Sequence, residues 1–397
     1  MVEPVFRENS AFIVLSSSNE YVPYLYTALS SIIDNSSLKH NYDLLILEKN
    51  ISDKNKEEIL KLSQNNISIR FYHFDDLIKK YGFNFYTLSH VSVETYFKLC
   101  IPLLLKNISK CIFLDSDVIV KDDLYKLYSI DMEDYPICAA HCCLISGLYN
   151  YSNRLKAYVN NQLCLPDVKT YFQGGVLLIN TNKWKELSAT EHLIKSVQQN
   201  DFEYVDQCAL NKFFVNSIKY IEQKWNYETV QRGFIPTYQV TDDDILKIHK
   251  EAKKDCAIIH YSGKYKPWFY PDEEFADIWW QYARKTPFYE EILTRMIQYQ
   301  SNNENMQNNA VTQLRNELTK IHLPNINNRF IANEYNTKLN YVLEHMFLFK
   351  WIKFKYKIEK ALSFGEKHER YKRKYKNVKQ LIKDAKQLKK QFLNFNY

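Results

Sequence analysis

Long hydrophobic runs are missing from this chain, and their absence excludes a class of proteins. No segment of about 18 consecutive apolar residues occurs, so the sequence predicts no membrane-spanning helix. The first residues, MVEPVFRENS, lack the basic segment and apolar core of a secretion signal, and we expect none. Glycine (7) and proline (10) are scarce among the 397 residues, but apolar residues make up 46%, enough for a sizeable core.

Cysteine patterns typical of zinc sites and disulfide frameworks are also absent. The eight cysteines lie mostly inside apolar segments, and no CxxC pair occurs. We therefore expect reduced thiols in the core of a cytoplasmic protein. No internal repeat is visible either.

Charge is present but unevenly distributed. Residues 341–397 hold sixteen Lys/Arg and five Asp/Glu, a local charge of +11. Because the whole chain carries +7, residues 1–340 carry −4. A mildly acidic body with a basic tail indicates an anionic partner for the tail, either a membrane or a nucleic acid.

The basic tail has an amphipathic pattern. One face of a helix over 377–395 would carry Val378, Leu381, Ile382, Ala385, Leu388 and Phe392. Lysines around the rest favour an anionic membrane surface over packing on the body or pairing with another tail. We expect no nucleic-acid partner, because no recognition motif accompanies the charge.

Strand-like and helix-like segments alternate in the first half of the chain. Strands are predicted at 11–17, 42–50, 67–74 and 110–120, and helices at 21–35, 52–65 and 93–105, the second capped by Ser52. This alternation predicts an α/β fold with a mostly parallel sheet covered on both faces. In open sheets of this type, ligands bind beyond the carboxyl ends of the strands.

The second half of the chain is less regular. The sequence predicts a glycine pair and buried strand at 171–184, a helix at 204–214, a short strand and loop at 256–268, and two helices broken at Pro287. The polar stretch SNNENMQNN then marks a boundary. We expect a main domain over 1–300, a polar linker with a helical segment over 301–340, and a basic amphipathic helical tail over 341–397.

Asp115 and Asp117 follow the apolar stretch CIFL. On a regular strand, carboxylates two residues apart share one face and repel, so one pKa would rise. A divalent cation such as Mg²⁺ or Mn²⁺ removes this conflict and bridges carboxylates to a substrate phosphate. The alternative is a helix cap or a solvated turn, since Asp122 and Asp123 follow at once.

The stretch IIHYSGKYKPW places His260 at the end of a predicted strand. An imidazole beside two carboxylates favours Mn²⁺ over Mg²⁺ or Ca²⁺. Gly263 would let the backbone approach a phosphate, and Lys266 could neutralise a leaving diphosphate. For His260 taken alone, an ordinary surface-loop histidine is the alternative.

The stretches FLDSDVIV, YFQGGVLLINTNKW, VDQCALN and HYSGKYKPW occur in this order and together resemble the four motifs of glycosyltransferase family 8. This family includes glycogenin and bacterial lipopolysaccharide galactosyl- and glucosyltransferases. The resemblance covers roughly residues 11–300 and implies a Rossmann-like GT-A domain with an α/β fold. It implies a retaining transfer of glucose or galactose from a UDP-sugar to a glycan or glycolipid acceptor. With the tail, it suggests a cytoplasmic enzyme peripheral to the inner face of the cytoplasmic membrane.

The resemblance also implies roles for individual residues. The metal ligands would be Asp115, Asp117 and His260, with Mn²⁺ as the expected ion and Mg²⁺ as the alternative. Asp206 and Gln207 would lie beside the transferred sugar as catalytic residues. The donor-binding residues would be Ser18, Asn19, Tyr21, Lys98, Asp115, Ser116, Gln173, Gly174, Gly263 and Lys266.

Some positions depart from the family's pattern. The first-strand loop, 17–21, lacks the usual acidic residues that contact uridine, although Tyr21 could stack on a base. Gln173 and Gly174 stand where the family often has Asn-Ala. No aspartate follows the predicted strand before His141 and Cys142, so the sequence does not name the hexose.

The residues alone leave alternatives open. Gln207 has an amide, a poor nucleophile, which favours departure and attack on one face of the sugar over a covalent sugar–enzyme intermediate. Asp206 could instead cap the helix that follows. Paired carboxylates also occur in metal-dependent phosphoryl-transfer enzymes. A sugar-nucleotide-binding or scaffold protein on a decayed transferase fold is the non-enzyme alternative.

Overall fold

The computed structural model of this chain describes residues 1–82, 93–302 and Lys372. The chain divides into two compact units, Met1–Met296 and Ile297–Tyr397. The predicted linker and basic tail, 301–397, lie outside the described residues except at their first two positions and Lys372. Within the described part, no helix has the length and hydropathy that crossing a membrane requires.

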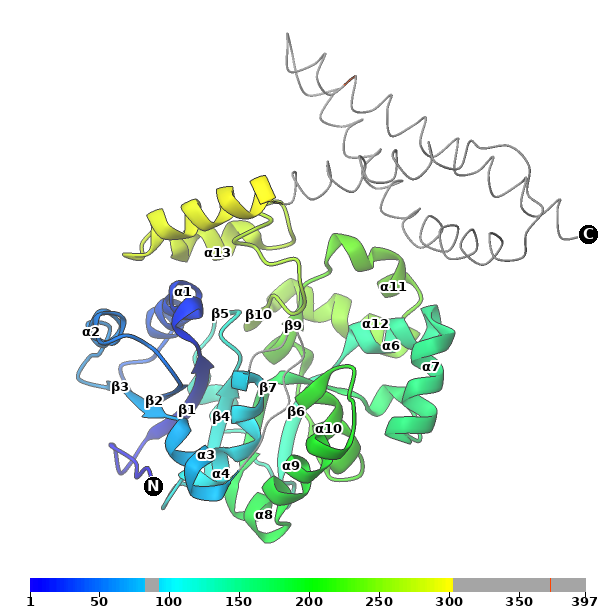
Figure 1. The fold of residues 1–397 in the computed structure, drawn as a ribbon, viewed down its shortest axis with the longest axis horizontal. Coiled ribbons are helices and arrows are strands. Elements are labelled where there is room, and N and C mark those ends of the chain that lie inside the picture. The colour runs from blue at the N-terminus through cyan, green and yellow to red at the C-terminus, as the bar shows by residue number, and fades with distance from the viewer. Residues whose placement is uncertain (83–92, 303–371, 373–397) are drawn as a thin grey trace, which may run out of the picture. The chain divides into compact units, whose positions relative to one another are not determined.

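A seven-stranded sheet forms the centre of the first unit (Figure 1). Its order is β3-β2-β1-β4-β7-β6-β8. The strands are β1 (Ser10–Ser17), β2 (Asn41–Glu48), β3 (Ile67–His73), β4 (Lys110–Leu114), β6 (Ile137–His141), β7 (Phe172–Asn180) and β8 (Ile218–Tyr220). All neighbours are parallel except β7, which runs antiparallel to both β4 and β6. The predicted mostly parallel sheet is therefore confirmed.

Helices cover both faces of this sheet (Figure 1). One face packs against α1 (Val22–Asp34), α2 (Asp53–Leu60), α5 (Leu124–Tyr128) and α13 (Ala276–Ala283). The other packs against α3 (Asp75–Tyr81), α4 (Ile101–Leu104), α8 (Thr181–Glu186), α9 (Ala189–Gln199) and α10 (Val205–Phe214). Burial on both faces explains why β1 reads as a continuous apolar run rather than as an alternating one.

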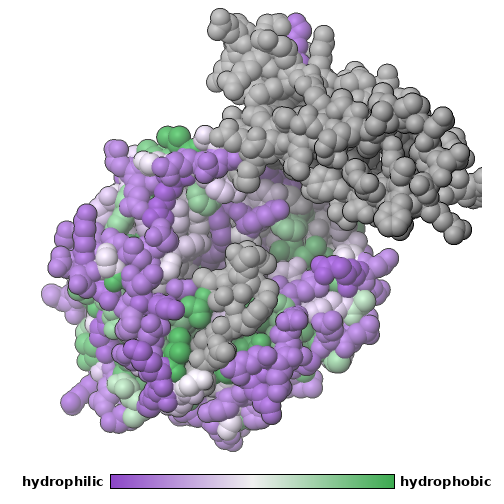
Figure 2. Space-filling view, viewed as in Figure 1, coloured by the Kyte–Doolittle hydropathy of each residue, from purple (hydrophilic) through white to green (hydrophobic). Residues whose placement is uncertain are grey.

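Four further helices lie on the side of the first unit that holds β6 (Figure 1). They are α6 (Cys143–Tyr151), α7 (Asn153–Tyr158), α11 (Ile235–Gln239) and α12 (Asp243–Ala252). Hydrophilic residues dominate the rim of the face in Figure 2, and hydrophobic residues show nearer its middle. All eight cysteines are free, and all but Cys164 are buried, as expected for core thiols.

Two of the element boundaries that the sequence predicts are present in the structure, and one predicted helix differs. Ser52 caps α2, because its Oγ accepts a hydrogen bond from the Asn55 N–H at 3.3 Å. The chain turns at Pro287 and is helical again from residue 289, as predicted. The predicted helix 93–105 differs, since Val93–Cys100 form a 3-10 helix that leads into α4.

The prediction of one continuous strand over 110–120 is wrong. The run divides into β4 and β5 (Val118–Val120), and β5 belongs to a second, three-stranded sheet. That sheet has the order β5-β10-β9, with β10 (Ile258–His260) antiparallel to β5 and parallel to β9 (Tyr227–Glu228). Asp115 and Asp117 lie in the break, where the two sheets meet.

Candidate active site

The three predicted metal ligands lie together at the junction of the two sheets. Asp115, Asp117 and His260 each offer one ligand atom, and these atoms lie within 4.8 Å of one another. His260 Nε2 is 3.2 Å from Asp117 Oδ1 and 3.9 Å from Asp115 Oδ2. The pairing of His260 with Val118 across β10 and β5 brings the imidazole beside the aspartates. The carboxyl end of β4 thus holds the group, as expected for an open sheet.

The donor atoms of this group fit a divalent cation. Asp117 Oδ1 is buried and accepts no hydrogen bond from the described residues, an arrangement that costs free energy. His260 Nδ1 lies 2.9 Å from Asn226 Oδ1. An amide oxygen is an acceptor, so this contact favours a proton on Nδ1, and in the neutral imidazole Nε2 then has a lone pair facing the aspartates. Carboxylate oxygens with one imidazole nitrogen suit Mn²⁺ better than Mg²⁺.

Two lysines pair with the aspartates. Lys98 Nζ donates to Asp115 Oδ1 at 3.1 Å, to Gly174 O at 3.0 Å, and pairs with Asp206 Oδ2 at 2.9 Å. Lys266 pairs with Asp117 and donates to Tyr261 O at 2.7 Å. We call Lys98, Asp115, Asp117, Asp206, His260 and Lys266 the site cluster. Three carboxylates against two lysines leave it one unit negative when His260 is neutral.

Burial and charge act in opposite directions on the pKa values of the site cluster. Burial lowers the pKa of Lys98, but the Asp115 and Asp206 carboxylates raise it by more, so the amine stays charged. Burial raises the pKa of Asp117, yet Lys266 and the protonated form of His260 bring it well below its ordinary value. For Asp115, burial outweighs the lowering by Lys98, and the net pKa is raised. Neighbouring aspartates thus have opposite shifts, as expected for carboxylates that share a site.

Asp206 and Gln207 lie in the first turn of α10. The helix begins after Tyr204, so the interpretation of Asp206 as its N-cap is wrong. Asp206 instead accepts a hydrogen bond from Thr95 Oγ1 at 3.1 Å and pairs with Lys98. Both contacts direct its carboxylate toward the site cluster.

The Gln207 amide is held at both of its ends. Its Oε1 accepts a hydrogen bond from Gly174 N–H at 2.9 Å, and its Nε2 donates to the Tyr171 hydroxyl at 3.4 Å. Tyr171 is 1% exposed and comes directly before β7. The amide oxygen therefore points along β7, toward the glycine pair.

Two adjacent glycines of β7 differ in how closely they approach the site cluster. A Cβ on Gly175 would lie 2.3 Å from His260 Cε1 and 2.6 Å from Asp115 Oδ2, so no side chain fits there. A Cβ on Gly174 would lie 3.5 Å from the Gln207 side chain, an ordinary contact. Sequence reasoning chose Gly174 and missed Gly175, although the paired glycines were a visible signal.

The loop after β1 carries three predicted donor-binding residues, and the charge of the site cluster acts on one of them, Tyr21. Tyr21 lies edge-on to the Trp268 ring at 5.7 Å, and burial together with the Asp117 charge raises its pKa. Asn19 Oδ1 accepts from Ser52 N–H at 3.0 Å and from Asn55 Nδ2 at 2.9 Å, so this amide joins the loop to α2. Ser18 starts the short 3-10 turn that follows without a side-chain capping bond.

Ser116 and Gly263 complete the predicted set. Ser116 Oγ donates to Ser16 O at 2.7 Å, which joins the break after β4 to the end of β1. Gly263 has φ +78°, and a Cβ there would lie 3.0 Å from Gln231 Oε1. The turn before Lys266 therefore favours glycine for its backbone, and a Cβ would also press on the Gln231 side chain.

The sequence analysis did not identify several buried polar residues around the site. Asn226 is 0% exposed and contacts His260 and Gln173. Glu228 is 1% exposed and accepts from Cys143 N–H at 3.0 Å and from Ser262 Oγ at 3.3 Å. The sequence QKWNYE gave no sign that these residues support the His260 loop.

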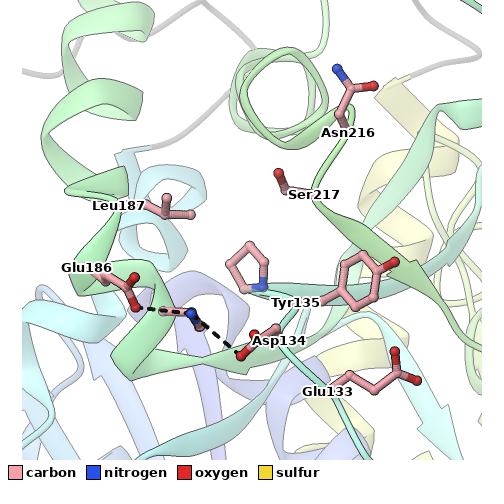
Figure 3. A pocket seen from close by; sticks show the side chains of 9 residues that line it. Glu133, Asp134, Tyr135, Glu186, Leu187, Asn216 and Ser217 are labelled. Atoms are coloured by element: carbon pink, nitrogen blue, oxygen red, sulfur yellow. Dashed lines mark ion pairs between the residues drawn. The ribbon is translucent and has the colours of Figure 1, made fainter.

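A cavity of about 670 Å³ lies elsewhere, at the opposite edge of the sheet (Figure 3). We call it the groove; it is lined by Glu133, Asp134, Tyr135, Pro136, Lys183, Glu186, Leu187, Asn216 and Ser217. These residues precede the parallel strands β6 and β8 or follow the antiparallel strand β7. Lys183 pairs with Asp134 at 3.5 Å and with Glu186 at 3.3 Å, and Lys219, outside the lining, pairs with Glu133 at 2.6 Å, so each carboxylate of the groove has a lysine partner.

Comparisons with known sequences agree with this geometry. The sequence profile of glycosyl transferase family 8 matches residues 12–272. A putative glycosyltransferase of Haemophilus influenzae is 31% identical over 269 residues, which are 64% of this chain and 72% of that protein. Glycosyltransferase GlyF of Streptococcus pneumoniae serotype 4 is 27% identical over 281 residues, 68% of this chain and 60% of that protein.

Solved structures share the fold. The apo structure of the bifunctional glycosyltransferase WbbM matches with a TM-score of 0.67 and 25% identity over 74% of this chain. The match covers 53% of WbbM, so this chain spans about half of that protein. Galactosyltransferase LgtC, solved with donor and acceptor sugar analogues, matches with a TM-score of 0.58 and 24% identity over 70% of this chain and 96% of LgtC. The predicted GT-A fold is confirmed.

Proposed function

Because this chain belongs to glycosyltransferase family 8 and is a glycosyltransferase, we propose that it moves a hexose, glucose or galactose, from a UDP-sugar to a glycan acceptor with retention of anomeric configuration. The cation-binding residues would be Asp115, Asp117 and His260, with Mn²⁺ as the preferred ion. One observation carries the proposal: a bare imidazole Nε2 and a buried carboxylate oxygen without a donor lie 3.2 Å apart. Such atoms are suited to share a cation.

Each residue of the site cluster has a defined task in this reaction. A bound divalent cation would neutralise charge on the departing UDP diphosphate. Lys266, after the Gly263 turn, would bind the same diphosphate as a point charge. Lys98 keeps Asp115 and Asp206 in place, because its ammonium contacts both carboxylates. Asp206 is then positioned to accept hydrogen bonds from sugar hydroxyls.

Gln207 would act at the anomeric carbon. Its amide oxygen is held by Gly174 N–H, and a second lone pair could stabilise an oxocarbenium-like centre. An amide is a poor nucleophile, which favours departure of UDP and attack of the acceptor on the same face of the sugar. LgtC also has a glutamine in its active site, which one of its solved structures replaces with glutamate.

We further propose that the acceptor is lipid-linked and that 341–397 binds an anionic membrane at its cytoplasmic face. The support is the +11 charge and the apolar helical face in the sequence. Binding of the full chain to vesicles containing anionic lipid should weaken as salt rises, because exposed lysine charges are screened. Vesicles of neutral lipid are the control, and equal binding to both would contradict the proposal.

The decisive experiment measures slow hydrolysis of a panel of UDP-sugars. We expect turnover of UDP-glucose or UDP-galactose with Mn²⁺ and none after chelation, with activity restored when Mn²⁺ is added back. Full turnover in metal-free buffer would refute the assignment of Asp115, Asp117 and His260. Phosphate release from simple phosphoesters, without UDP-sugar turnover, would favour a phosphoryl-transfer enzyme instead.

Gln207→Ala separates binding from chemistry. If Gln207 acts on the developing cation, kcat should fall by about 10²-fold or more while donor affinity changes little. An unchanged kcat would remove Gln207 from the mechanism.

A further inference from the structure

Asn226 connects two residues that belong to different sheets. It ends the 3-10 turn Gln223–Asn226 directly before β9, and it is 0% exposed. Its Oδ1 lies 2.9 Å from His260 Nδ1 on β10, and its Nδ2 donates to Gln173 Oε1 on β7 at 2.9 Å. One buried amide therefore links a candidate metal ligand to a candidate donor-binding residue.

A backbone group sets the direction of this hydrogen-bond chain. Gly175 N–H donates to Gln173 Oε1 at 2.5 Å, and a backbone amide cannot reverse its polarity. The side-chain oxygen of Gln173 therefore faces Asn226, so Asn226 must donate a hydrogen bond from its Nδ2–H₂ group. That leaves Asn226 Oδ1 facing His260, so the imidazole proton lies on Nδ1. Reversing the Asn226 amide would bring two carbonyl oxygens together at Gln173.

The same chain fixes what Gln173 can offer a ligand. Its Oε1 already accepts two hydrogen bonds, one from Gly175 and one from Asn226. Within 1–82 and 93–302, its Nε2 donates no hydrogen bond. Gln173 can thus act on a ligand only as a donor, and the matching group is an acceptor oxygen.

We propose that Asn226 is a positioning residue that sets the hydrogen-bond polarity of the donor site. It keeps His260 Nε2 without a proton, ready to act as a ligand atom, and it leaves Gln173 Nε2–H₂ for an acceptor oxygen of the donor's sugar. The second part rests on the proposed function, whereas the His260 tautomer does not. Two separate measurements therefore test the two parts.

The first measurement is ¹⁵N NMR of the imidazoles at alkaline pH, without metal or nucleotide, with His260→Gln assigning the signal. We expect His260 in the wild type to carry its proton on Nδ1. Asn226→Ala removes the acceptor, so the signal should shift to the Nε2–H form that a free histidine side chain prefers. Asn226→Asp keeps an acceptor and should retain Nδ1–H. If Asn226→Ala also retains Nδ1–H, the positioning role is wrong.

Metal affinity checks the consequence of the tautomer. Titration of Mn²⁺ alone, followed by electron paramagnetic resonance, should show about 10- to 100-fold weaker binding in Asn226→Ala, the range found when a ligand's supporting partner is lost. Asn226→Asp should bind Mn²⁺ more tightly than Asn226→Ala. Equal weakening in both variants would contradict a role through the imidazole proton and indicate only a loss of packing.

The second measurement compares binding of UDP-glucose or UDP-galactose with binding of UDP alone. Gln173→Glu keeps both acceptor contacts but removes the N–H₂ group, so the sugar's added affinity should fall while UDP binding changes less. Asn226→Asp disturbs the same Gln173 amide. The double variant of Gln173→Glu and Asn226→Asp should therefore lose no more of the sugar's added affinity than the more affected single variant. Additive losses, or an unchanged sugar contribution in Gln173→Glu, would overturn the role of Gln173. If no UDP-sugar binds at all while the tautomer shift occurs, the proposed function fails and the positioning of His260 stands.

Discussion

The site cluster and the groove contain the same types of side chain, at opposite edges of one sheet. Both pair a lysine with two carboxylates: Lys98 with Asp115 and Asp206, and Lys183 with Asp134 and Glu186. Their burial differs. The side chains of Lys98 and Asp206 are 4% and 11% exposed, whereas those of Lys183 and Asp134 are 31% and 94% exposed.

This difference teaches that burial, more than charge or cavity volume, distinguishes the two regions. In the groove, water screens the pairs, and such surface pairs contribute little to stability. In the site cluster, burial strengthens the interactions between charged groups, so partner charges raise the pKa of Lys98 and lower that of Asp117 against the effect of burial. For Asp115, burial itself raises the pKa. Among the described residues, the buried carboxylate oxygen without a hydrogen bond is Asp117 Oδ1, in the site cluster. The groove offers volume without such an unsatisfied group.

The largest expected effect comes from Lys98→Met. This change removes the cation that contacts Asp115 and Asp206 and leaves two carboxylates without their partner. Breaking a buried pair in this way typically costs about 3–5 kcal/mol of unfolding free energy. Urea unfolding should show this loss, and Mn²⁺ should restore part of it by replacing the lost positive charge.

The same substitution in the groove, Lys183→Met, is the matched control for Lys98→Met. The two variants lose the same charge and gain the same side chain, so their difference reports burial. Equal unfolding midpoints for both variants would mean that the comparison between the two regions is wrong.

The next effect in size is expected from the glycine pair of β7. Gly175→Ala would force a methyl group against His260 and Asp115, so the ligand atoms must separate. We expect UDP-sugar hydrolysis to fall about 100-fold, near the loss seen when an oriented electrostatic group is displaced. Gly174→Ala adds the same methyl group one residue earlier and meets only an ordinary contact, so its loss should be much smaller. Equal losses would show that the close approach at Gly175 is unimportant.

These glycines also show how far sequence could predict the site. The motifs brought Asp115, Asp117 and His260 into one hypothesis, and the structure brings their ligand atoms within 4.8 Å. Their roles stay predictions, as do those of Ser18, Asn19 and the other donor-binding residues. Gly175 and Asn226 were missed because close approach to an imidazole is a property of three segments remote in sequence. Residue type alone did not reveal it.

The fold was predicted better than its local breaks. Alternating segments predicted β1, β2, β3 and β4 and the helices between them, because apolar periodicity is a local signal. The division of 110–120 into β4 and β5 was not predictable, since both halves are equally apolar. It depends on tertiary hydrogen bonds, such as Asp115 N–H to Gly175 O at 2.7 Å and Tyr261 N–H to Asp117 O at 3.0 Å. The interpretation of Asp206 as an N-cap was wrong for a similar reason: its carboxylate pairs with Lys98, a residue remote in sequence.

A smaller effect concerns acid stability. The pKa of Asp117 is lower in the folded chain than its ordinary value of about 3.9, because Lys266 and the protonated form of His260 outweigh burial. Its ionised form therefore stabilises the fold above that ordinary value, and this contribution is lost as pH falls through the folded pKa. Asp117→Asn should be less stable than the wild type at neutral pH, by on the order of 1–2 kcal/mol.

Unfolding curves from pH 7 to pH 3 test this sign. The stability difference between the wild type and Asp117→Asn should narrow as pH falls, because the wild type loses the contribution that the variant lacks. The Asp117 charge also raises the pKa of Asp115, so the comparison is repeated in an Asp115→Asn background, where this coupling is absent. A difference that stays constant with pH would show that the charge of Asp117 does not stabilise the fold.

The smallest effect is expected in the groove, where charges can be reversed rather than removed. Lys183→Glu places a carboxylate beside Asp134 and Glu186, yet Asp134 is 94% exposed and water can separate the repelling groups. We expect an unchanged kcat for UDP-sugar hydrolysis and an unfolding midpoint within experimental error of the wild type at 0.15 M salt, where screening is strong. Lowering the salt should reveal a small destabilisation, because the screening length increases. A fall in kcat at either salt concentration would show that a charge change in the groove affects the reaction at the site cluster, at the other edge of the sheet. Burial would then be an insufficient criterion for the functional edge.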